Sequence, residues 1–409
     1  MYEQGTRLLG LEGFAVTAVV ERGDELDLEV ELVSSAGVCP ACGRASCEVK
    51  ERPVVRVRDL SIAGRRTFLR WRKRRFRCQA CAATFTESDE QLPVRQRVTR
   101  RFRVRLFERA REGGAHAEVA RGEETTRYQV GRAFTLGAAG VLAAHAEERP
   151  PRWLALDEAH HRRGHHLATV VCDPDRRRVV EVLEGRSRRV VEGYLRSLAP
   201  ERRAAIEVVS IDPYDAYRQA VRAVLPGATV VCDPFHLVRG ANEALDTVRR
   251  ERQRGARSRW RTTTRKRASA QGWRQDLFYA RHRLLRGSER LSFRDRQALC
   301  ELFEREPLVA EAWGLKEAFR AIYRSSTRAE AEDRLERFLA AVERAAIPSF
   351  AAFAQGVRRW RAELLAYFDA PVTNGYAEGV INKVKVIKRR AYGLPTFAGF
   401  RRRILVACG

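Results

Sequence analysis

The alternation of apolar and polar residues predicts a β-rich N-terminal region. Ala15–Val20 and Glu25–Val33 alternate with the period of two that half-buried strands show, so they predict a strand pair. Further along, Arg65–Arg77 mixes β-forming residues with many cations, which predicts a basic hairpin. Residues 1–95 are therefore expected to form one domain.

Residues 97–145 have helical periodicity in three pieces that glycines separate. Gly113 and Gly114 end the first piece, and Gly122 ends the second. The third piece begins with Thr, a residue that caps helix N-termini. The three pieces are Arg100–Glu112, Ala115–Arg121 and Thr125–Phe134.

This arrangement predicts a helix-turn-helix domain over residues 96–148, in which the third piece is the recognition helix. The side chains that this helix would expose are Thr126, Arg127, Gln129 and Arg132. Glu123 and Glu124 lie in the turn and would repel phosphate, so a plain helical linker is the alternative.

A different pattern begins after residue 149. The predicted elements are strands at Trp153–Leu156, His166–Cys172 and Val179–Leu183, a helix at Ser187–Leu198, a strand at Ile206–Ile211, a helix at Tyr214–Val224 and a strand at Ala228–Cys232. The order β-β-β-α-β-α-β is that of the ribonuclease-H-like fold, a mixed α/β sheet with helices on its faces. Residues 149–240 are expected to form the first part of this core, 241–370 a helical insertion, and 371–409 the part that completes it.

Two carboxylates fall at the ends of predicted strands in this core. Asp157 follows the first strand and Asp212 follows the fourth. Because these strands are neighbours in the expected sheet, both carboxylates should converge at one edge. A lone strand-end Asp is usually a turn residue. Asp233 also follows a strand, so it is a rival to Asp212.

The stretch Asn374–Gly393 combines one carboxylate with many cations. Read as a helix, it places Glu378 beside an apolar stripe. The stripe consists of Ala377, Val380, Ile381, Val384 and Ile387, and the cations are Lys383, Lys385, Lys388, Arg389 and Arg390. A phosphate-bearing ligand would attract the cations but would repel the carboxylate. A divalent metal ion that binds both the carboxylate and the phosphate would remove this repulsion. The alternative is a solvated basic helix.

Composition points to nucleic acid as the partner. The 409 residues contain 78 Lys and Arg against 52 Asp and Glu, a formal net charge of +26, and the basic residues are mostly Arg. Arg binds phosphate bidentately and stacks on bases. The candidate DNA-binding residues are Arg70, Arg72, Lys73, Arg74 and Arg75 in the basic hairpin, Arg127, Gln129 and Arg132 in the recognition helix, and the five cations of Asn374–Gly393. Without an apolar run long enough to span a membrane, a cytoplasmic, nucleoid-associated protein is expected.

Two CxxC pairs predict a structural zinc site in residues 1–95. Cys39 and Cys42 form the first pair, and Cys78 and Cys81 form the second. Four thiolates from two such pairs provide the tetrahedral geometry of a closed Zn²⁺ site. Cys47 is a spare thiol that could replace one ligand.

These motifs together resemble the DDE transposases of bacterial insertion sequences, specifically the ISL-three family. The resemblance covers nearly the whole chain and rests on CPACG with a later CxxC, LDE at Asp157, VVSIDPYDAYRQAV around Asp212, VVCDPFHLVR around Asp233, and NGYAEGVINKVKVIKRRAYG. The last motif is the most specific.

The resemblance implies a catalytic triad of Asp157, Asp212 and Glu378. It implies that these residues hold two Mg²⁺ or Mn²⁺ ions, which assist water in freeing a 3′-hydroxyl at each element end and assist that hydroxyl in attacking target DNA. The expected partners are the terminal inverted repeats, the target DNA and further copies of this chain on the DNA.

Two other functions use the same features. A DNA-binding regulator with a degenerate nuclease core would bind a specific site without cutting it. A structure-selective nuclease on the same fold would cut DNA without joining it.

Overall fold

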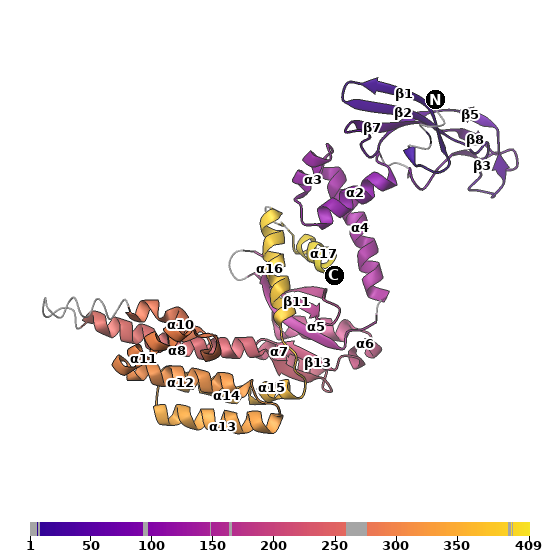
Figure 1. The fold of residues 1–409 in the computed structure, drawn as a ribbon. Helices are drawn as coiled ribbons and strands as arrows, with labels where there is room; N and C mark the ends of the chain where they lie inside the picture. The colour runs from indigo at the N-terminus through magenta and orange to yellow at the C-terminus, as the bar shows by residue number, and fades with distance from the viewer. Residues whose placement is uncertain are drawn as a thin grey trace. The chain divides into compact units, whose positions relative to one another are not determined.

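The computed structural model describes residues 6, 9–92, 97–147, 149–162, 166–258, 276–391, 394 and 396–409, in two compact units (Figure 1). The first unit comprises Met1–Ala146 and Ile387–Leu394, and the second comprises Glu147–Val386 and Pro395–Gly409. Each unit has its own hydrophobic core.

The first unit begins with a four-stranded sheet in the order β1-β2-β7-β6. Its strands are β1 (Phe14–Arg22), β2 (Glu25–Leu32), β6 (Val54–Arg58) and β7 (Arg66–Arg72). The predicted strand pair is confirmed, because β1 and β2 pair antiparallel. Phe14, Leu69 and Trp71 are buried at the centre of this sheet's core.

The predicted basic hairpin is wrong. Its two halves, β7 and β8 (Arg75–Arg77), belong to different sheets. β8 pairs with β5 (Val49–Glu51) and β9 (Thr84–Thr86) instead of β7. The turn between β7 and β8 is held by the residue before β6, since the Lys73 amide donates to the carbonyl of Pro53 at 2.9 Å. A two-stranded ladder of β3 (Gly37–Val38) and β4 (Ala45–Ser46) completes the β-rich part.

Three helices follow in the first unit: α2 (Arg100–Arg111), α3 (His116–Gly122) and α4 (Arg127–Glu147). Thr99 caps α2 through its side chain. The three predicted helical pieces are confirmed, with two changes of boundary in the third. The cap of α4 is Thr126, which accepts from the Gln129 amide, and α4 runs thirteen residues beyond the expected end at Phe134 to Glu147.

The second unit contains a five-stranded mixed sheet in the order β12-β11-β10-β13-β14. The strands are β10 (Trp153–His160), β11 (Leu167–Asp173), β12 (Arg178–Glu184), β13 (Val208–Ile211) and β14 (Thr229–Cys232). β10, β11 and β12 form an antiparallel meander, whereas β10, β13 and β14 are parallel. The predicted strand order along the chain and the adjacency of β10 and β13 are confirmed.

Helices enclose this sheet and extend its core. Leu154 and Leu156 on β10 pack in one cluster with residues of α5 (Arg188–Ser197) and α7 (Asp215–Val224). The short α6 (Pro200–Ala204) lies between α5 and β13 in the chain. α17 (Phe397–Cys408) packs against β12, where Arg401 forms an ion pair with Glu181.

The segment between β14 and Asn374 is helical, as expected. It contains α8 (Pro234–Ser258), α10 (Arg281–Leu285), α11 (Phe293–Arg305), α12 (Pro307–Ile322), α13 (Arg328–Ala345), α14 (Pro348–Arg359) and α15 (Arg361–Leu365), with 3-10 turns at Ser288–Arg290 and Ala366–Phe368. Its apolar residues belong to the same core as those of the sheet. In the described ranges, no helix is both long and apolar enough to cross a membrane.

The chain returns to the sheet as α16 (Gly375–Arg390), drawn in yellow in Figure 1. The predicted apolar stripe is confirmed, because all five of its residues from Ala377 to Ile387 are buried. Tyr392 and Gly393, at the end of the motif, lie outside the described residues.

Candidate active site and metal-binding residues

Three carboxylates lie on or directly after the parallel strands of the second unit. Asp212 and Asp233 directly follow β13 and β14, as predicted. Asp157 differs from the prediction, because β10 continues past it to His160. By the alternation of a strand, Asp157 lies on the face opposite to that of Leu154 and Leu156, which pack in the core. Asp157 therefore lies within β10 rather than after its end.

Asn374 connects these strands to α16. Its side-chain amide donates to Asp212 Oδ1 and to the carbonyl of Leu156, both at 3.2 Å. Its backbone amide donates to Asp233 Oδ1 at 3.1 Å. The Glu378 amide donates to the Asn374 carbonyl at 2.9 Å, so Glu378 lies one helical turn further along α16.

His236, in the first turn of α8, lies between two of the carboxylates. Its Nδ1 is 3.1 Å from Asp212 Oδ1 and 3.0 Å from Asp233 Oδ2. The ligand atoms of these three residues lie within 4.8 Å of one another, a group that does not include Asp157 or Glu378. The pKa of His236 is raised, because the carboxylates of Asp233, Asp212 and Asp157 together outweigh the opposing effect of burial.

The carboxylates influence one another's protonation. Burial raises the pKa of Asp212 to about 7, and the carboxylate of Asp157 adds to that rise while His236 opposes it. Burial also raises the pKa of Asp157, with smaller contributions from Glu158 and Glu378. Glu378 is therefore close enough to Asp157 to act on it electrostatically, although the Glu378 side chain is exposed.

The predicted triad differs from the neighbouring acids in its lack of Lys and Arg partners, although His236 lies against Asp212. Glu158 pairs with Arg186 at 2.9 Å, and Asp215 pairs with Arg218. Across the described ranges, no Lys or Arg forms an ion pair with Asp157, Asp212 or Glu378. The same ranges supply no hydrogen-bond donor to Asp157 Oδ2, to Asp212 Oδ2 or to the carboxylate of Glu378. In a chain of net charge +26, these oxygens fit a site for a divalent cation, which prefers carboxylate ligands.

The four predicted zinc ligands converge in the first unit. The Sγ atoms of Cys39 and Cys81 are 3.7 Å apart, and those of Cys42 and Cys78 are 3.5 Å apart. A tetrahedron with Zn–S bonds of about 2.3 Å has edges of about 3.8 Å. All four Sγ atoms lie within 4.8 Å of one another, and the spare Cys47 is outside this group.

The two CxxC segments have matching turns. The amides of Gly43 and Ala82 donate to the carbonyls of Cys39 and Cys78 at 2.8 and 2.9 Å. Both residues have positive φ, +72° for Gly43 and +59° for Ala82, which lets the chain turn back after each second Cys. Backbone amides of Cys81 and Ala80 lower the pKa of the Cys78 thiol to about 6, which favours the thiolate that binds metal.

Of the five predicted DNA-binding residues in Arg70–Arg75, Arg74 is the buried one. Its side chain is 10% exposed and forms an ion pair of 2.8 Å with Glu87, which is 4% exposed. The Glu87 carboxylate also accepts from the Arg74 amide at 2.8 Å. The Arg74 side chain is therefore engaged inside the protein, which does not favour the predicted contact with DNA.

The other members of that basic stretch differ in exposure. Arg72 is exposed, and Arg75 is exposed and pairs with Glu51. Arg70 is half-buried beside Glu29, at 3.7 Å. Lys73 is half-buried over the ring of Trp71, and burial lowers its pKa.

The acidic turn before the predicted recognition helix is neutralised. Glu123 pairs with Arg105 at 3.1 Å and with Arg109 at 3.8 Å, and Glu124 lies 3.9 Å from Arg66. These contacts offset the negative charge that would otherwise repel phosphate at the start of α4.

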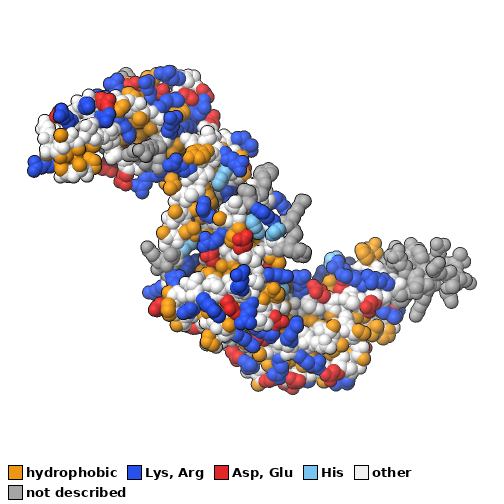
Figure 2. All heavy atoms as spheres, turned by 180° about the vertical axis from the view of Figure 1, so that it is seen from behind, with side chains coloured by type: hydrophobic (Ala, Val, Ile, Leu, Met, Phe, Trp, Pro, Cys, Tyr) orange, Lys and Arg blue, Asp and Glu red, His pale blue; other side chains and the backbone are white. Residues whose placement is uncertain are grey.

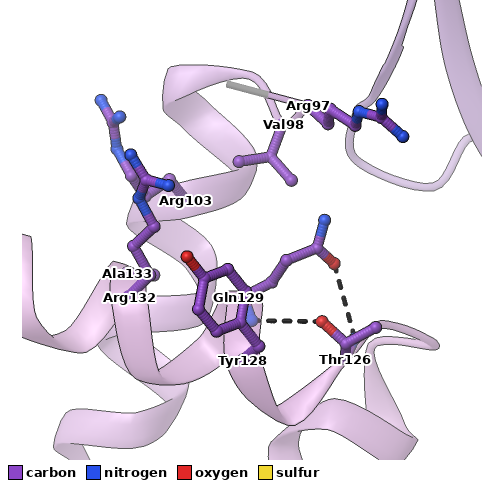
Figure 3. A pocket seen from close by; sticks show the side chains of 8 residues that line it. All are labelled: Arg97, Val98, Arg103, Thr126, Tyr128, Gln129, Arg132 and Ala133. Carbon is purple, nitrogen blue, oxygen red and sulfur yellow. Dashed lines mark hydrogen bonds between the residues drawn. The ribbon is translucent and has the colours of Figure 1, made fainter. Parts of the chain in front are cut away.

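A basic pocket of about 300 Å³ lies beside the start of α4 (Figure 3). Arg103 from α2 and Arg132 from α4 line it together with the exposed ring of Tyr128. Burial lowers the pKa of Arg103, and the positive charges of Arg100 and Arg132 add to this effect. Gln129 also lines the pocket and is held by Thr126, as the dashed lines in Figure 3 show. Arg127 is exposed in the first turn of α4.

The cations of α16 are mostly accessible. Lys383, Lys385, Arg389 and Arg390 are exposed, whereas Lys388 is half-buried and has a lowered pKa because of burial. Lys383 Nζ donates to the carbonyl of Ala407 in α17, which removes part of its freedom to bind another group. On the face seen in Figure 2, Lys and Arg side chains are distributed widely, with acidic side chains between them.

Sequence reasoning missed the connecting role of Asn374. It had a local signal, because Asn374 directly precedes a helix that carries a candidate ligand. The i, i+3 spacing of Asp233 and His236 likewise brings two side chains together at a helix start.

Comparison with known proteins gives two family matches. A transposase model, that of the DDE transposases of the ISL-three family, matches residues 154–404. The zinc-finger of transposase IS204/IS1001/IS1096/IS1165 matches residues 35–81. The first range contains Asp157, Asp212 and Glu378, and the second contains all four cysteines of the thiol cluster.

Individual transposases are also similar to this chain. It is 29% identical over 393 residues to the transposase for insertion sequence element IS1001 of Bordetella parapertussis, a match that covers 94% of this chain and 92% of that protein. It is 31% identical over 252 residues to the transposase for insertion sequence element IS1557 of Mycobacterium tuberculosis (strain CDC 1551 / Oshkosh), covering 59% of this chain and 56% of that protein.

Proposed function

Since the chain belongs to the ISL-three family of DDE transposases, we propose that it binds the terminal inverted repeats of an insertion sequence, cleaves DNA at the element ends and joins the 3′ ends to target DNA. The observation that carries this proposal is that Asp157 interacts electrostatically with both Asp212 and Glu378, while none of the three has a Lys or Arg partner in the described ranges. The sheet order β12-β11-β10-β13-β14, with β10 and β13 parallel, supports a ribonuclease-H-like core.

Asp157, Asp212 and Glu378 would hold the divalent ions, two Mg²⁺ or Mn²⁺ per site. When bound, such ions supply activation of the attacking oxygen and charge stabilisation at the leaving oxygen. Asp157 and Asp212 are fixed on neighbouring parallel strands, and Glu378 is brought to them by the first turn of α16. The chain therefore provides two metal ligands from the sheet and one from a helix.

Asp212 is a better ligand than its rival Asp233. Both oxygens of Asp233 are engaged, Oδ1 by the Asn374 amide and Oδ2 by His236. In Asp212, the contacts with the Asn374 side-chain amide and with His236 both fall on Oδ1, which leaves Oδ2 available to a cation. We assign metal binding to Asp212 and a supporting role to Asp233.

In the reaction, water attacks the phosphodiester at the element end and the 3′ oxygen leaves with its bonding electrons. The 3′-hydroxyl then attacks a target phosphodiester, releasing one of its oxygens in turn. The exposed cations Lys383, Lys385, Arg389 and Arg390 on α16 hold the DNA backbone, and Lys388 contributes less because it is half-buried.

The first unit recognises DNA. The exposed Arg127 and Arg132, with Gln129, read the element end from α4, and Arg103 adds charge in the pocket of Figure 3. Arg70, Arg72, Lys73 and Arg75 add backbone contacts. One Zn²⁺ bound by the four cysteines fixes the segments that carry these strands. Several copies of the chain assemble on DNA in the cytoplasm.

A joining assay tests the function. Duplexes ending in the sequences that flank the gene are incubated with purified protein, Mg²⁺ or Mn²⁺ and a target plasmid. Transposase activity predicts metal-dependent release of 3′-hydroxyl ends from uncut flanks and joining of pre-cut ends to the plasmid. Cutting without joining would identify a nuclease, and specific binding without cutting in either metal would identify a regulator.

A further inference from the structure

We infer that Asn374 is a positioning residue that places Glu378 and the Asp212 carboxylate for metal binding. This inference rests on the proposed function. Asn374 is 2% exposed and directly precedes α16, the helix that carries Glu378. Its hydrogen bonds reach β10, β13 and the residue that directly follows β14.

The side chain of Asn374 is fixed in one orientation. Its Oδ1 accepts from the Ser210 hydroxyl at 2.6 Å, and the Ser210 oxygen accepts from the Trp153 indole at 3.0 Å. Because the indole nitrogen can only donate, the single hydroxyl proton of Ser210 is left for Asn374. The Nδ2 group must then face its two acceptors, the Leu156 carbonyl and Asp212 Oδ1. A flipped amide would place an oxygen against both of them.

The backbone of Asn374 is held separately. Its amide donates to Asp233 Oδ1, and the other oxygen of Asp233 meets His236. Asn374 is thus bonded to β10 through Leu156, to β13 through Ser210, and to the residue that follows β14. The start of α16 is attached at more than one point, so it cannot shift along one strand without breaking bonds to the others.

The hydrogen bonds of Asn374 position two proposed metal ligands, Glu378 and Asp212. The Asn374 carbonyl accepts the Glu378 amide at 2.9 Å, so the first turn of α16 transmits the position of Asn374 to Glu378. On the strand side, the bond to Asp212 Oδ1 restrains that carboxylate and leaves Oδ2 for a cation. Metal ligands need this support, because residues that orient ligands typically change metal affinity or activity by about 10- to 100-fold when replaced.

A purely structural role is the alternative. In that case Asn374 would only stabilise the junction of α16 with the sheet. Replacing it would lower the unfolding temperature, but the folded protein would bind metal and cleave DNA as the wild type does.

The test compares Asn374→Ala and Asn374→Asp with Thr373→Ala, which alters the exposed neighbouring residue. Three quantities are measured on the full chain: the Mn²⁺ dissociation constant of the protein by electron paramagnetic resonance, the DNA dissociation constant without metal, and the Mn²⁺ dependence of cleavage. Thermal unfolding is followed in parallel, and each value is corrected for the folded fraction.

Asn374→Ala is expected to weaken Mn²⁺ binding by about 10-fold or more and to reduce cleavage by about 100-fold, with DNA affinity changed less than about twofold. Asn374→Asp is expected to lose more, because it places a carboxylate oxygen against Asp212 and the Leu156 carbonyl. Ser210→Ala frees the amide to rotate and should give an intermediate loss. Thr373→Ala should match the wild type in all measurements.

Wild-type Mn²⁺ affinity and cleavage in folded Asn374→Ala would overturn the inference and leave the proposed function intact. An equal loss in Thr373→Ala would also overturn it, since the effect would then belong to the whole segment. Failure of the proposed function has a different signature, namely wild-type protein that binds the flanking DNA without cutting it, or that cuts it without joining it to the target.

Discussion

The side-chain amide of Asn374 donates a hydrogen bond to Asp212 Oδ1 across 162 positions of the chain. The helices from α8 to α15 lie between these two residues in sequence. The chain therefore leaves the sheet after β14 and returns to the same edge at Asn374, so the helical segment does not separate the carboxylates. A site made from two distant segments depends on the contacts that join them.

Asp233 and Asp212 are predicted to differ in their effects on catalysis. Asp233→Asn keeps an oxygen that can accept the Asn374 amide, so it should lower the cleavage rate by about 10- to 100-fold. Asp212→Asn removes a proposed metal ligand and should lower it by more than about 1,000-fold. Cleavage rates at saturating Mn²⁺ make the comparison. A larger loss in Asp233→Asn would reverse the two assignments.

Divalent metal is predicted to stabilise the second unit. The pKa of Asp212 is raised to about 7 mainly by burial and further by Asp157, so a bound cation would relieve an unfavourable group of carboxylates. At a metal concentration of about 100 times the dissociation constant, binding adds about 2.7 kcal/mol. The unfolding temperature should rise when Mg²⁺ is added to the wild type and should not change when Mg²⁺ is added to Asp212→Asn. An equal rise in both proteins would place the stabilising ion elsewhere.

The thiol cluster is predicted to contain one Zn²⁺ per chain. Cys39→Ser and Cys78→Ser should abolish zinc binding and destabilise the β-rich part of the first unit. Cys47→Ser is the matched control, because Cys47 is exposed and lies outside the cluster. Elemental analysis measures the zinc content. Wild-type protein purified without zinc, and unaffected by chelators, would contradict this assignment.

Arg72 and Arg74 are predicted to have opposite roles despite their proximity in sequence. Arg74→Ala leaves the buried Glu87 carboxylate without its cation, which should cost about 3–5 kcal/mol of unfolding free energy. Arg72→Ala alters an exposed side chain and should change stability by less than about 0.5 kcal/mol while weakening DNA binding. Denaturant unfolding and DNA titrations at fixed salt separate the two effects. Weaker DNA binding by folded Arg74→Ala would restore it as a DNA contact.

Local pattern was sufficient for much of the fold. The apolar stripe from Ala377 to Ile387 is buried throughout, and the order of strands in the second unit follows the predicted periodicity. The spacing of the CxxC pairs was also sufficient to bring four thiols together. In each case, the signal lies in residues close together in the chain.

What could not be predicted depends on partners far away in the sequence. Nothing near Arg74 indicates that it pairs with Glu87, and nothing in Arg65–Arg77 assigns β7 and β8 to different sheets. The partners of Asn374 become neighbours only after the sheet has formed. Composition therefore predicts a basic region without showing which of its cations form ion pairs inside the protein.

The most direct test of the account is cleavage of duplex DNA carrying the gene's flanking sequences by the wild type and by Asp157→Asn, Asp212→Asn and Glu378→Gln. Asp215→Asn is the matched control, because Asp215 is already paired with Arg218. Metal binding by the three carboxylates predicts Mg²⁺- or Mn²⁺-dependent release of 3′-hydroxyl ends by the wild type and the control, reduced by more than about 1,000-fold in each triad variant while DNA binding is retained. Cleavage at the wild-type rate by any one of the three would contradict it.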